Sequence, residues 1–152
     1  MSKVLAIETS CDETAVSIVS RSQNTYMIHS NIIASQIEDH SKWGGVVPEL
    51  AARKHLESIP YVIENALEKA EMNIEEVDAI ASTVAPGLVG SLRVGSIAAR
   101  TLCLLYSKPF MGIHHLEGHL SSVLFLKNHP NPPFLVLLVS GGHTELIKVD
   151  KG

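Results

Sequence analysis

The stretch KVLAIETSCDETAVSIV, residues 3–19, decides the fold of this chain. Apolar and β-branched residues form two runs, 4–7 and 14–19, and the polar segment 8–13 separates them. This pattern is typical of a β-hairpin, in which a short polar turn joins two paired strands. The sequence therefore predicts that the chain opens with a strand, a turn and a second strand.

A second stretch near the other end of the sequence repeats this pattern. Residues 134–139 and 144–149 are rich in Leu, Val and Ile, and the small turn SGGH, residues 140–143, lies between them. Two such hairpins in one chain are expected in a two-lobed fold of the actin and sugar-kinase type, where each lobe begins with a hairpin whose turn faces the cleft. A strand–turn–strand unit is also common in other α/β proteins, so the repeat alone leaves both interpretations open.

The segment between the hairpins predicts alternating strands and helices. Apolar residues recur at three- and four-residue spacings over 50–72, which predicts an amphipathic helix or a pair of helices. Pro48 suits the first turn of this helix, and Pro60 would kink it. The other predicted elements are a strand over residues 26–35, a polar loop over 36–43, a strand over 79–84 and a small-residue helix ending near residue 106.

Composition and charge limit the class of protein. A chain of 152 residues, 45% hydrophobic and 18% charged, supports one soluble domain with a core but not two full lobes. Its formal charge of −4 argues against coating nucleic acid by charge alone, although a local basic patch or a partner subunit could supply phosphate contacts. No stretch predicts a secretion signal or a membrane span, and two cysteines without a Cys-x-x-Cys pair fit a reducing compartment. We therefore expect a cytoplasmic protein without membrane contact.

Residues 128–133 (NHPNPP) predict a linker, because so many prolines cannot continue a helix or lie in a central strand. This linker would divide the chain into a complete lobe, residues 1–127, and a hairpin, residues 134–152, that no later element covers. An isolated two-stranded hairpin is marginally stable in water. We therefore expect an α/β chain that consists of one lobe and the opening hairpin of a truncated second lobe.

His115 and His119 stand four residues apart in a segment that continues as an apolar helix. Residues four apart share one face of a helix, with Cβ atoms about 5–6 Å apart, so the two imidazoles could bind one metal ion. The alternative is a pair of solvent-facing or core histidines where a strand meets a helix. A zinc-peptidase helix would need a glutamate directly after the first histidine, and Leu116 occupies that position.

Two turns carry further candidate residues. Asp12 and Glu13 lie in the first hairpin's turn, where they could act as general base or position an amine; they could equally be solvated turn residues. The glycine pair Gly141 and Gly142 leaves backbone amides open to a ligand phosphate. Residues 86–91 (PGLVGS) could bind an anion at a helix start, or their glycines could serve only close packing.

Five ordered segments together resemble one family. They are IETSCDET (7–14), GGVVPELA (44–51), PGLVGSL (86–92), HHLEGH (114–119) and VSGGHT (139–144). This set resembles the tRNA N6-adenosine threonylcarbamoyltransferase family, the bacterial TsaD or Gcp proteins once described as glycoproteases. The resemblance implies an actin-like ATPase fold. It also implies an acyltransferase that moves the threonylcarbamoyl group from threonylcarbamoyl-AMP to the N6 amine of the adenosine 3′ of the tRNA anticodon.

The same resemblance implies site residues and partners. In that family the histidines matching His115 and His119 ligate an iron(II) or zinc ion, whose third ligand would lie outside this chain. The substrate-binding turn matches Leu138, Val139, Ser140, Gly141 and Gly142. TsaB-like and TsaE-like subunits are the implied protein partners. Family members are about twice as long, so we expect the N-terminal half of such an enzyme. A non-catalytic partner-binding module is the alternative.

Overall fold

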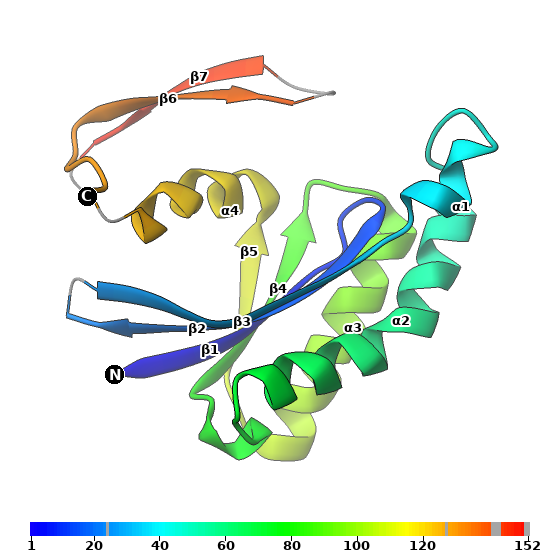
Figure 1. The fold of residues 1–152 in the computed structure, drawn as a ribbon, viewed down its shortest axis with the longest axis horizontal. Helices are drawn as coiled ribbons and strands as arrows, with labels where there is room; N and C mark the ends of the chain where they lie inside the picture. Colours follow the sequence, from blue (N-terminus) through cyan, green and yellow to red (C-terminus); the bar gives the residue numbers. More distant parts are fainter. Residues whose placement is uncertain (24, 127, 141–143, 151–152) are drawn as a thin grey trace. The chain divides into compact units, whose positions relative to one another are not determined.

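The computed structural model describes residues 1–23, 25–126, 128–140 and 144–150. The chain forms two compact units, Met1–His115 and Leu116–Gly152, and the boundary falls at the start of a helix (Figure 1). The predicted division at residues 128–133 stays a prediction. Among the described residues, no helix combines the length and the apolar character that a membrane span requires.

The first unit is built on a five-stranded mixed sheet. Its strand order is β3-β2-β1-β4-β5, in which β1 pairs antiparallel with β2 and parallel with β4. Strands β2 and β3 are antiparallel, and β4 and β5 are parallel. The elements are β1 (Ser2–Glu8), β2 (Glu13–Ser22), β3 (Thr25–Ser35), α1 (Ile37–Ser41), α2 (Pro48–Lys69), η1 (Ile74–Glu76), β4 (Ala79–Ala85), α3 (Val89–Tyr106) and β5 (Phe110–His114).

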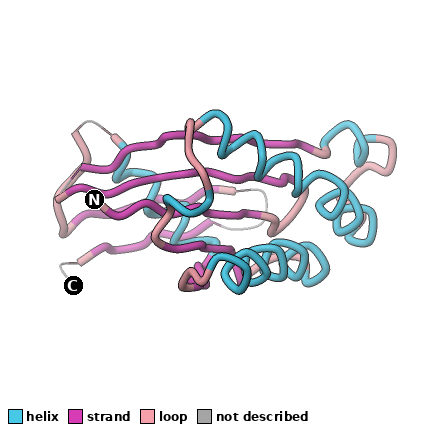
Figure 2. Tube along the Cα trace, turned by 90° about the horizontal axis from the view of Figure 1, so that it is seen from below, coloured by secondary structure: helices cyan, strands magenta, loops and turns pink. Residues whose placement is uncertain are grey.

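One face of this sheet carries the core. Helices α2 and α3 lie side by side against that face (Figures 1 and 2). Successive side chains of a strand point to opposite faces, so every second residue of β1 and β2 meets the helices. The buried apolar residues are Leu5, Ile7, Val16, Ile18, Ile59, Val62, Ala66, Ile74, Val77, Ile80, Ala99 and Cys103. Burial of this apolar surface is the main force that holds the unit together.

The second unit is small. It contains the rest of α4 (His115–Ser121), the short helix η2 (Ser122–Phe125), and the strands β6 (Phe134–Val139) and β7 (Thr144–Val149). Strands β6 and β7 form a separate two-stranded antiparallel sheet. Four apolar side chains of this sheet are each about two-thirds exposed: Leu135, Leu137, Val139 and Leu146.

The structure confirms most predicted elements and corrects one. Both hairpins, the strand near residues 26–35, the strand near 79–84 and the two long helices are present. Helix α2 begins at Pro48 and runs as one element through Pro60. The loop predicted over residues 36–43 is wrong in part, because α1 lies within it; its single turn is closed by the bond from the His40 amide to the Gln36 carbonyl, 3.1 Å. Strand β5 was not predicted as a separate element.

Candidate functional site

A cluster of polar side chains lies where three parallel strands end. Glu8 is the last residue of β1, Thr83 lies near the end of the neighbouring β4, and His115 directly follows β5, the next strand. The carboxyl ends of parallel strands meet at one edge of a sheet, which is where ligands bind in many α/β proteins. The topology therefore brings together residues that are far apart in the sequence.

Glu8 is held from two sides. The backbone N–H of Ser10 donates to Glu8 Oε1 at 2.5 Å, and the Thr83 hydroxyl donates to Glu8 Oε2. Burial alone would raise the pKa of Glu8, but the hydrogen bonds from Ser10 and Thr83 and the charge of a protonated His115 outweigh it, so the pKa is lowered. Glu8 is therefore an ionised carboxylate at neutral pH.

The imidazole of His115 contacts this carboxylate. Its Nδ1 lies 3.4 Å from Glu8 Oε2 and 3.2 Å from Ser10 Oγ. The side chains of His115 and Glu8 are 30% and 36% exposed, so both remain accessible to a ligand. Both of these contacts involve Nδ1 of the ring.

The second predicted metal ligand, His119, lies one helical turn after His115 in α4 and is exposed. The predicted helical spacing of His115 and His119 is therefore confirmed, because both residues lie in α4. Within residues 1–23, 25–126, 128–140 and 144–150, no group of three or more His, Cys, Asp or Glu side chains is arranged to hold a metal ion. These two imidazoles fit an iron or zinc ion as nitrogen donors, and further ligands would have to come from elsewhere.

The acid pair has a different environment. Asp12 is half-buried, its backbone carbonyl accepts the Gln36 amide at 3.0 Å, and Glu13, the first residue of β2, is exposed. In the part of the chain that the structure describes, no hydrogen bond or ion pair links either carboxylate to Glu8 or His115. Burial raises the pKa of the adjacent Cys11 thiol, and the Asp12 carboxylate raises it further. Cys11 is therefore a neutral thiol at physiological pH.

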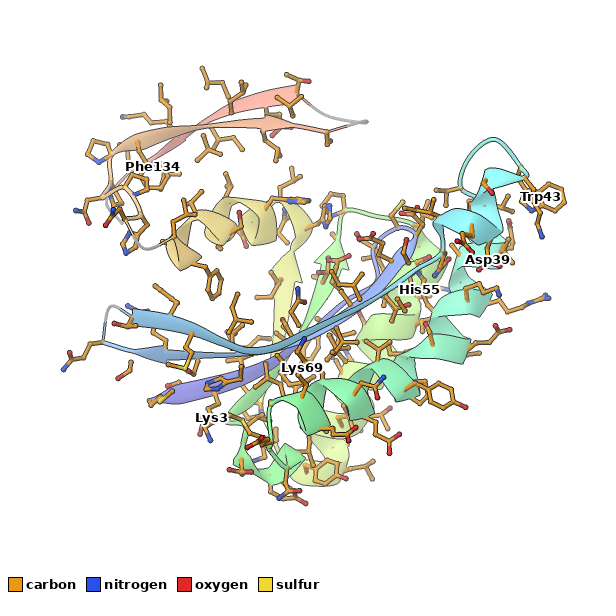
Figure 3. All side chains as sticks on the ribbon, viewed as in Figure 1. Lys3, Asp39, Trp43, His55, Lys69 and Phe134 are labelled. Carbon is orange, nitrogen blue, oxygen red and sulfur yellow. The ribbon has the colours of Figure 1, made fainter. Side chains whose placement is uncertain are left out.

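A buried polar network fixes the turn that carries this acid pair. His55 on α2 is fully buried beneath the turn, and its Nε2 lies 2.9 Å from the Cys11 carbonyl oxygen (Figure 3). Because a carbonyl can only accept, Nε2 carries the proton and Nδ1 accepts, from the Thr14 hydroxyl at 2.7 Å and from Gln36 Nε2 at 3.2 Å. Burial lowers the pKa of His55, so the ring is neutral.

The network extends to α1 and to the start of α2. The Oε1 of Gln36 accepts from His40 Nε2 at 3.0 Å, and His40 Nδ1 then accepts the Val47 amide at 3.3 Å. Both side chains are at least 96% buried, since Gln36 is 4% and His40 3% exposed. The sequence analysis singled out none of these residues. The signal in the sequence that could have pointed to this network was the presence of polar residues, among them Gln36, His40 and His55, on either side of the predicted helix start at Pro48.

The segment 86–91 packs tightly against the first turn. The Leu88 amide donates to the Ser10 carbonyl at 2.8 Å, and a Cβ on Gly87 would lie 2.5 Å from that same oxygen. A Cβ on Gly95, in α3, would lie 2.4 Å from Thr9 Oγ1. These contacts explain the glycines as packing residues, which was one of the two interpretations that the sequence left open.

The residues predicted to bind substrate lie at the end of β6. Leu138 is half-buried, and Val139 and Ser140 are exposed. Gly141 and Gly142 lie outside the described residues. The two strands that flank the turn pair from Val139 and Thr144 outward, as the predicted hairpin requires.

Comparison with known proteins identifies a family. A model described as TsaD, tRNA N6-adenosine threonylcarbamoyltransferase, matches residues 27–152. A protein of that name from Prochlorococcus marinus strain MIT 9515 is 79% identical over 149 residues, which are 98% of this chain and 42% of that protein. The protein of that name from strain NATL1A is 61% identical over 150 residues and is covered to the same 42%. The chain thus spans less than half the length of these curated relatives.

Similar solved structures confirm the predicted fold class, an α/β fold of the actin-like type. YeaZ from Pseudomonas aeruginosa has a TM-score of 0.53 at 17% identity, covering 74% of this chain and 45% of its own. The Aquifex aeolicus PPX-GPPA enzyme also has 0.53, at 13% identity, covering 98% and 48%. T. thermophilus RuvC, solved with a Holliday junction substrate, has 0.51 at 11% identity, covering 87% and 84%. At such low identity these similarities establish the fold alone.

Proposed function

The chain belongs to the tRNA N6-adenosine threonylcarbamoyltransferase (TsaD) family, and on that premise we propose that it supplies part of the site for threonylcarbamoyl transfer to tRNA. In the proposed reaction the N6 amine of the adenosine 3′ of the anticodon attacks the carbamoyl carbon of threonylcarbamoyl-AMP. A C–N bond forms, the bond from that carbon to the phosphate oxygen breaks, AMP leaves, and the amine loses one proton. The observation that carries this proposal is the 79% identity over nearly the whole chain.

We propose His115 and His119 as two ligands of a divalent metal ion, iron(II) or zinc. Their spacing of one helical turn in α4 supports this role. When bound, such an ion would polarise the carbamoyl oxygen as a Lewis acid. The two histidines would hold it. A third ligand would come from the part of the longer relatives that does not align with this chain.

Asp12 or Glu13 is the proposed acceptor of the amine proton. Hydrogen bonds from His55 and Gln36 hold the backbone carbonyls of Cys11 and Asp12. A turn held in this way supports the proposal that its carboxylates have a defined position and are not simply solvated. Leu138, Val139, Ser140, Gly141 and Gly142 are the proposed adenylate-binding turn. The β6–β7 hairpin supplies the backbone for it.

The proposed setting is the cytoplasm, where the tRNA substrate resides. The chain has a formal charge of −4, which disfavours binding of the negatively charged tRNA, so we propose that partner subunits supply part of the tRNA-binding surface. On the basis of the family, we propose TsaB-like and TsaE-like subunits as these partners. A non-catalytic partner-binding role would leave the chain without transfer activity in any context.

A chimera tests the proposed function. Residues 1–150 of this chain replace the matching part of the strain MIT 9515 relative, and the product is expressed in cells depleted of their own transferase. We expect the chimera to restore the modified adenosine in tRNA, measured by mass spectrometry of nucleosides, and His115→Ala or His119→Ala to abolish it. A folded chimera that leaves tRNA unmodified, beside an active parent, would refute the proposal.

Within the chimera, two further changes separate the assigned roles. Asp12→Asn and Glu13→Gln should lower transfer by about 10²–10⁴-fold if the replaced carboxylate takes the proton, with little change in adenylate binding. Gly142→Val should instead weaken adenylate binding, because a side chain blocks approach to the backbone amides.

A further inference from the structure

Gln36 connects three parts of the first unit: the turn between β1 and β2, helix α1 and helix α2. It lies between β3 and α1 and is 4% exposed. Its backbone N–H donates to the Asp12 carbonyl in the turn at 3.0 Å, and its own carbonyl accepts the His40 amide at 3.1 Å. Its side-chain amide lies between two imidazoles, with Oε1 3.0 Å from His40 Nε2 and Nε2 3.2 Å from His55 Nδ1.

Backbone groups at the two ends of this network determine where each proton lies. At one end the Val47 N–H can only donate, so His40 Nδ1 accepts it, and His40 Nε2 carries the proton that Gln36 Oε1 receives. At the other end the Cys11 carbonyl can only accept, so His55 Nε2 carries a proton, and His55 Nδ1 accepts from Gln36 Nε2. The two ends therefore require the same orientation of the Gln36 amide.

Every hydrogen bond along this path points the same way. The path starts at the Val47 amide, directly before α2, passes through the side chains of His40, Gln36 and His55, and ends at the Cys11 carbonyl. Buried hydrogen bonds in such a chain polarise and strengthen one another. The central residue must accept on one side and donate on the other, which a side-chain amide can do and an ionised carboxylate cannot.

Three successive carbonyls of the turn accept hydrogen bonds from outside it. The donors are the Leu88 amide for Ser10, the His55 and Ser91 side chains for Cys11, and the Gln36 amide for Asp12. Gln36 thus acts on the turn twice, directly at Asp12 and through His55 at Cys11. The acid pair Asp12 and Glu13 is attached to a backbone that these hydrogen bonds hold in place.

We propose that Gln36 is a positioning residue of the transfer reaction: directly through its amide and indirectly through His55, it fixes the backbone from which the carboxylates of Asp12 and Glu13 reach the amine proton. The inference rests on the proposed function for the role of this acid pair, whereas the proton positions are a property of the chain itself. Because Gln36 is buried, it acts through the turn and does not contact the substrate.

The first experiment measures the proton positions in the chain itself. Long-range ¹⁵N–¹H spectra of the ¹⁵N-histidine-labelled chain should show the neutral rings of His40 and His55 both protonated at Nε2. In Gln36→Glu the carboxylate cannot donate, so His55 should become protonated at Nδ1. Gln23→Glu makes the same change at the other glutamine of the chain, which is exposed, and should leave both rings unchanged. A wild-type Nδ1–H tautomer at either ring, or an unchanged His55 in Gln36→Glu, would overturn the network.

The second experiment measures transfer to tRNA by the purified chimera with the proposed partner subunits, per folded molecule, with circular dichroism as the check on folding. Gln36→Leu removes the side-chain hydrogen bonds and keeps the backbone amide. We expect kcat to fall by up to about 100-fold while KM for threonylcarbamoyl-AMP stays the same, because a small displacement of a catalytic group can have such an effect. Gln23→Leu should change neither constant. An unchanged kcat in folded Gln36→Leu would overturn the proposal.

A conservative pair at His55 distinguishes positioning from a loss of stability, and it gives the same decision if Gln36→Leu does not fold. His55→Gln keeps a side-chain N–H that can reach the Cys11 carbonyl, and His55→Leu does not. Per folded molecule, His55→Gln should therefore retain more activity than His55→Leu. Equal activity in the two variants would overturn the proposal.

A double substitution tests whether Gln36 acts through the acid pair. Where Asp12→Asn or Glu13→Gln has already removed the active carboxylate, Gln36→Leu should cause no further loss, because the two effects are coupled. A multiplied loss would overturn the positioning role and leave the acid pair intact. If neither acid substitution lowers transfer, the role of the acid pair is refuted, and the positioning role that rests on it fails as well.

Discussion

The first and last hairpins share one local pattern but differ in what covers them. In both, two apolar strands flank a short polar or small-residue turn, and the strands pair in antiparallel register. Strands β1 and β2 belong to a five-stranded sheet against which two helices pack, whereas β6 and β7, among the residues that the structure describes, form a sheet of two strands. Leu5 in the first hairpin is fully buried, and Leu137 in the last is 65% exposed.

This difference separates strand formation from strand stability. The alternating pattern is sufficient to predict a strand, since it depends on neighbours in the sequence. The free energy of folding depends on the apolar area removed from water, which only packing partners provide.

Amide hydrogen exchange should give the largest difference. Residues of β1 should exchange only on global unfolding, whereas an isolated two-stranded sheet opens locally. We expect protection factors in β1 at least about a thousandfold above those in β6, or about 4 kcal/mol. Equal protection in both hairpins would show that β6 and β7 are covered in solution.

Matched leucine truncations should give the next largest difference. Leu5→Ala removes a fully buried side chain and should lower the free energy of unfolding by about 2–5 kcal/mol. Leu137→Ala, at an exposed position of β6, should change it by no more than about 0.5 kcal/mol. Urea denaturation measures both. A large loss for Leu137→Ala would contradict the contrast between the hairpins.

The threonines near the start of each second strand make a polar pair for comparison. Thr14 is fully buried, and its hydroxyl contacts His55 Nδ1 and Ser58 Oγ; Thr144 is exposed. Thr14→Val should cost about 1–3 kcal/mol of unfolding free energy, because buried polar groups lose a partner. Thr144→Val should be neutral within about 0.5 kcal/mol. Thermal denaturation measures both variants. A larger loss of stability in Thr144→Val than in Thr14→Val would refute the claim that the buried network stabilises the fold.

The pH dependence of stability should show the smallest effect. We expect it to arise from His55, which contacts the turn of the first hairpin. Burial lowers the pKa of His55 in the folded state despite its bond to Cys11 and the nearby Glu8 and Asp12 charges. As the pH falls, the His55 ring is therefore protonated in the unfolded state at a higher pH than in the folded state. The free energy of unfolding should decrease as the pH drops below about 6.5, the ordinary pKa of histidine. His55→Gln should flatten this fall, while His129→Gln, in the second unit, should not. An unchanged slope in His55→Gln would exclude His55 as the cause.

The local elements were largely predictable, and the exceptions have physical reasons. Strands β1 and β2, helix α2 with Pro48 at its start, and the β6–β7 hairpin follow from periodicity and turn chemistry. Helix α1 was missed because five residues are too few to show a helical period. Strand β5 has only five residues before α4 and no turn to separate it from that helix.

The candidate site was predictable only in part. His115 and His119 were singled out because four-residue spacing is visible in a sequence, and their role as metal ligands stays a prediction. Asp12 and Glu13 were singled out for their charge, yet among the described residues no hydrogen bond or ion pair joins their carboxylates to Glu8. Glu8 was overlooked because its partners Thr83 and His115 are distant in sequence and meet it only at the sheet edge.

The sequence by itself determined the strands, the long helices, the helical histidine pair and the family resemblance, because each depends on residues close together in the chain or on motif order. Only the tertiary structure decided that Glu8 faces His115, that His55 holds the Cys11 carbonyl, and that one hairpin is buried while its counterpart is exposed. These outcomes depend on strand order and on helix packing against the sheet. Such long-range pairings leave no periodic trace in a single sequence.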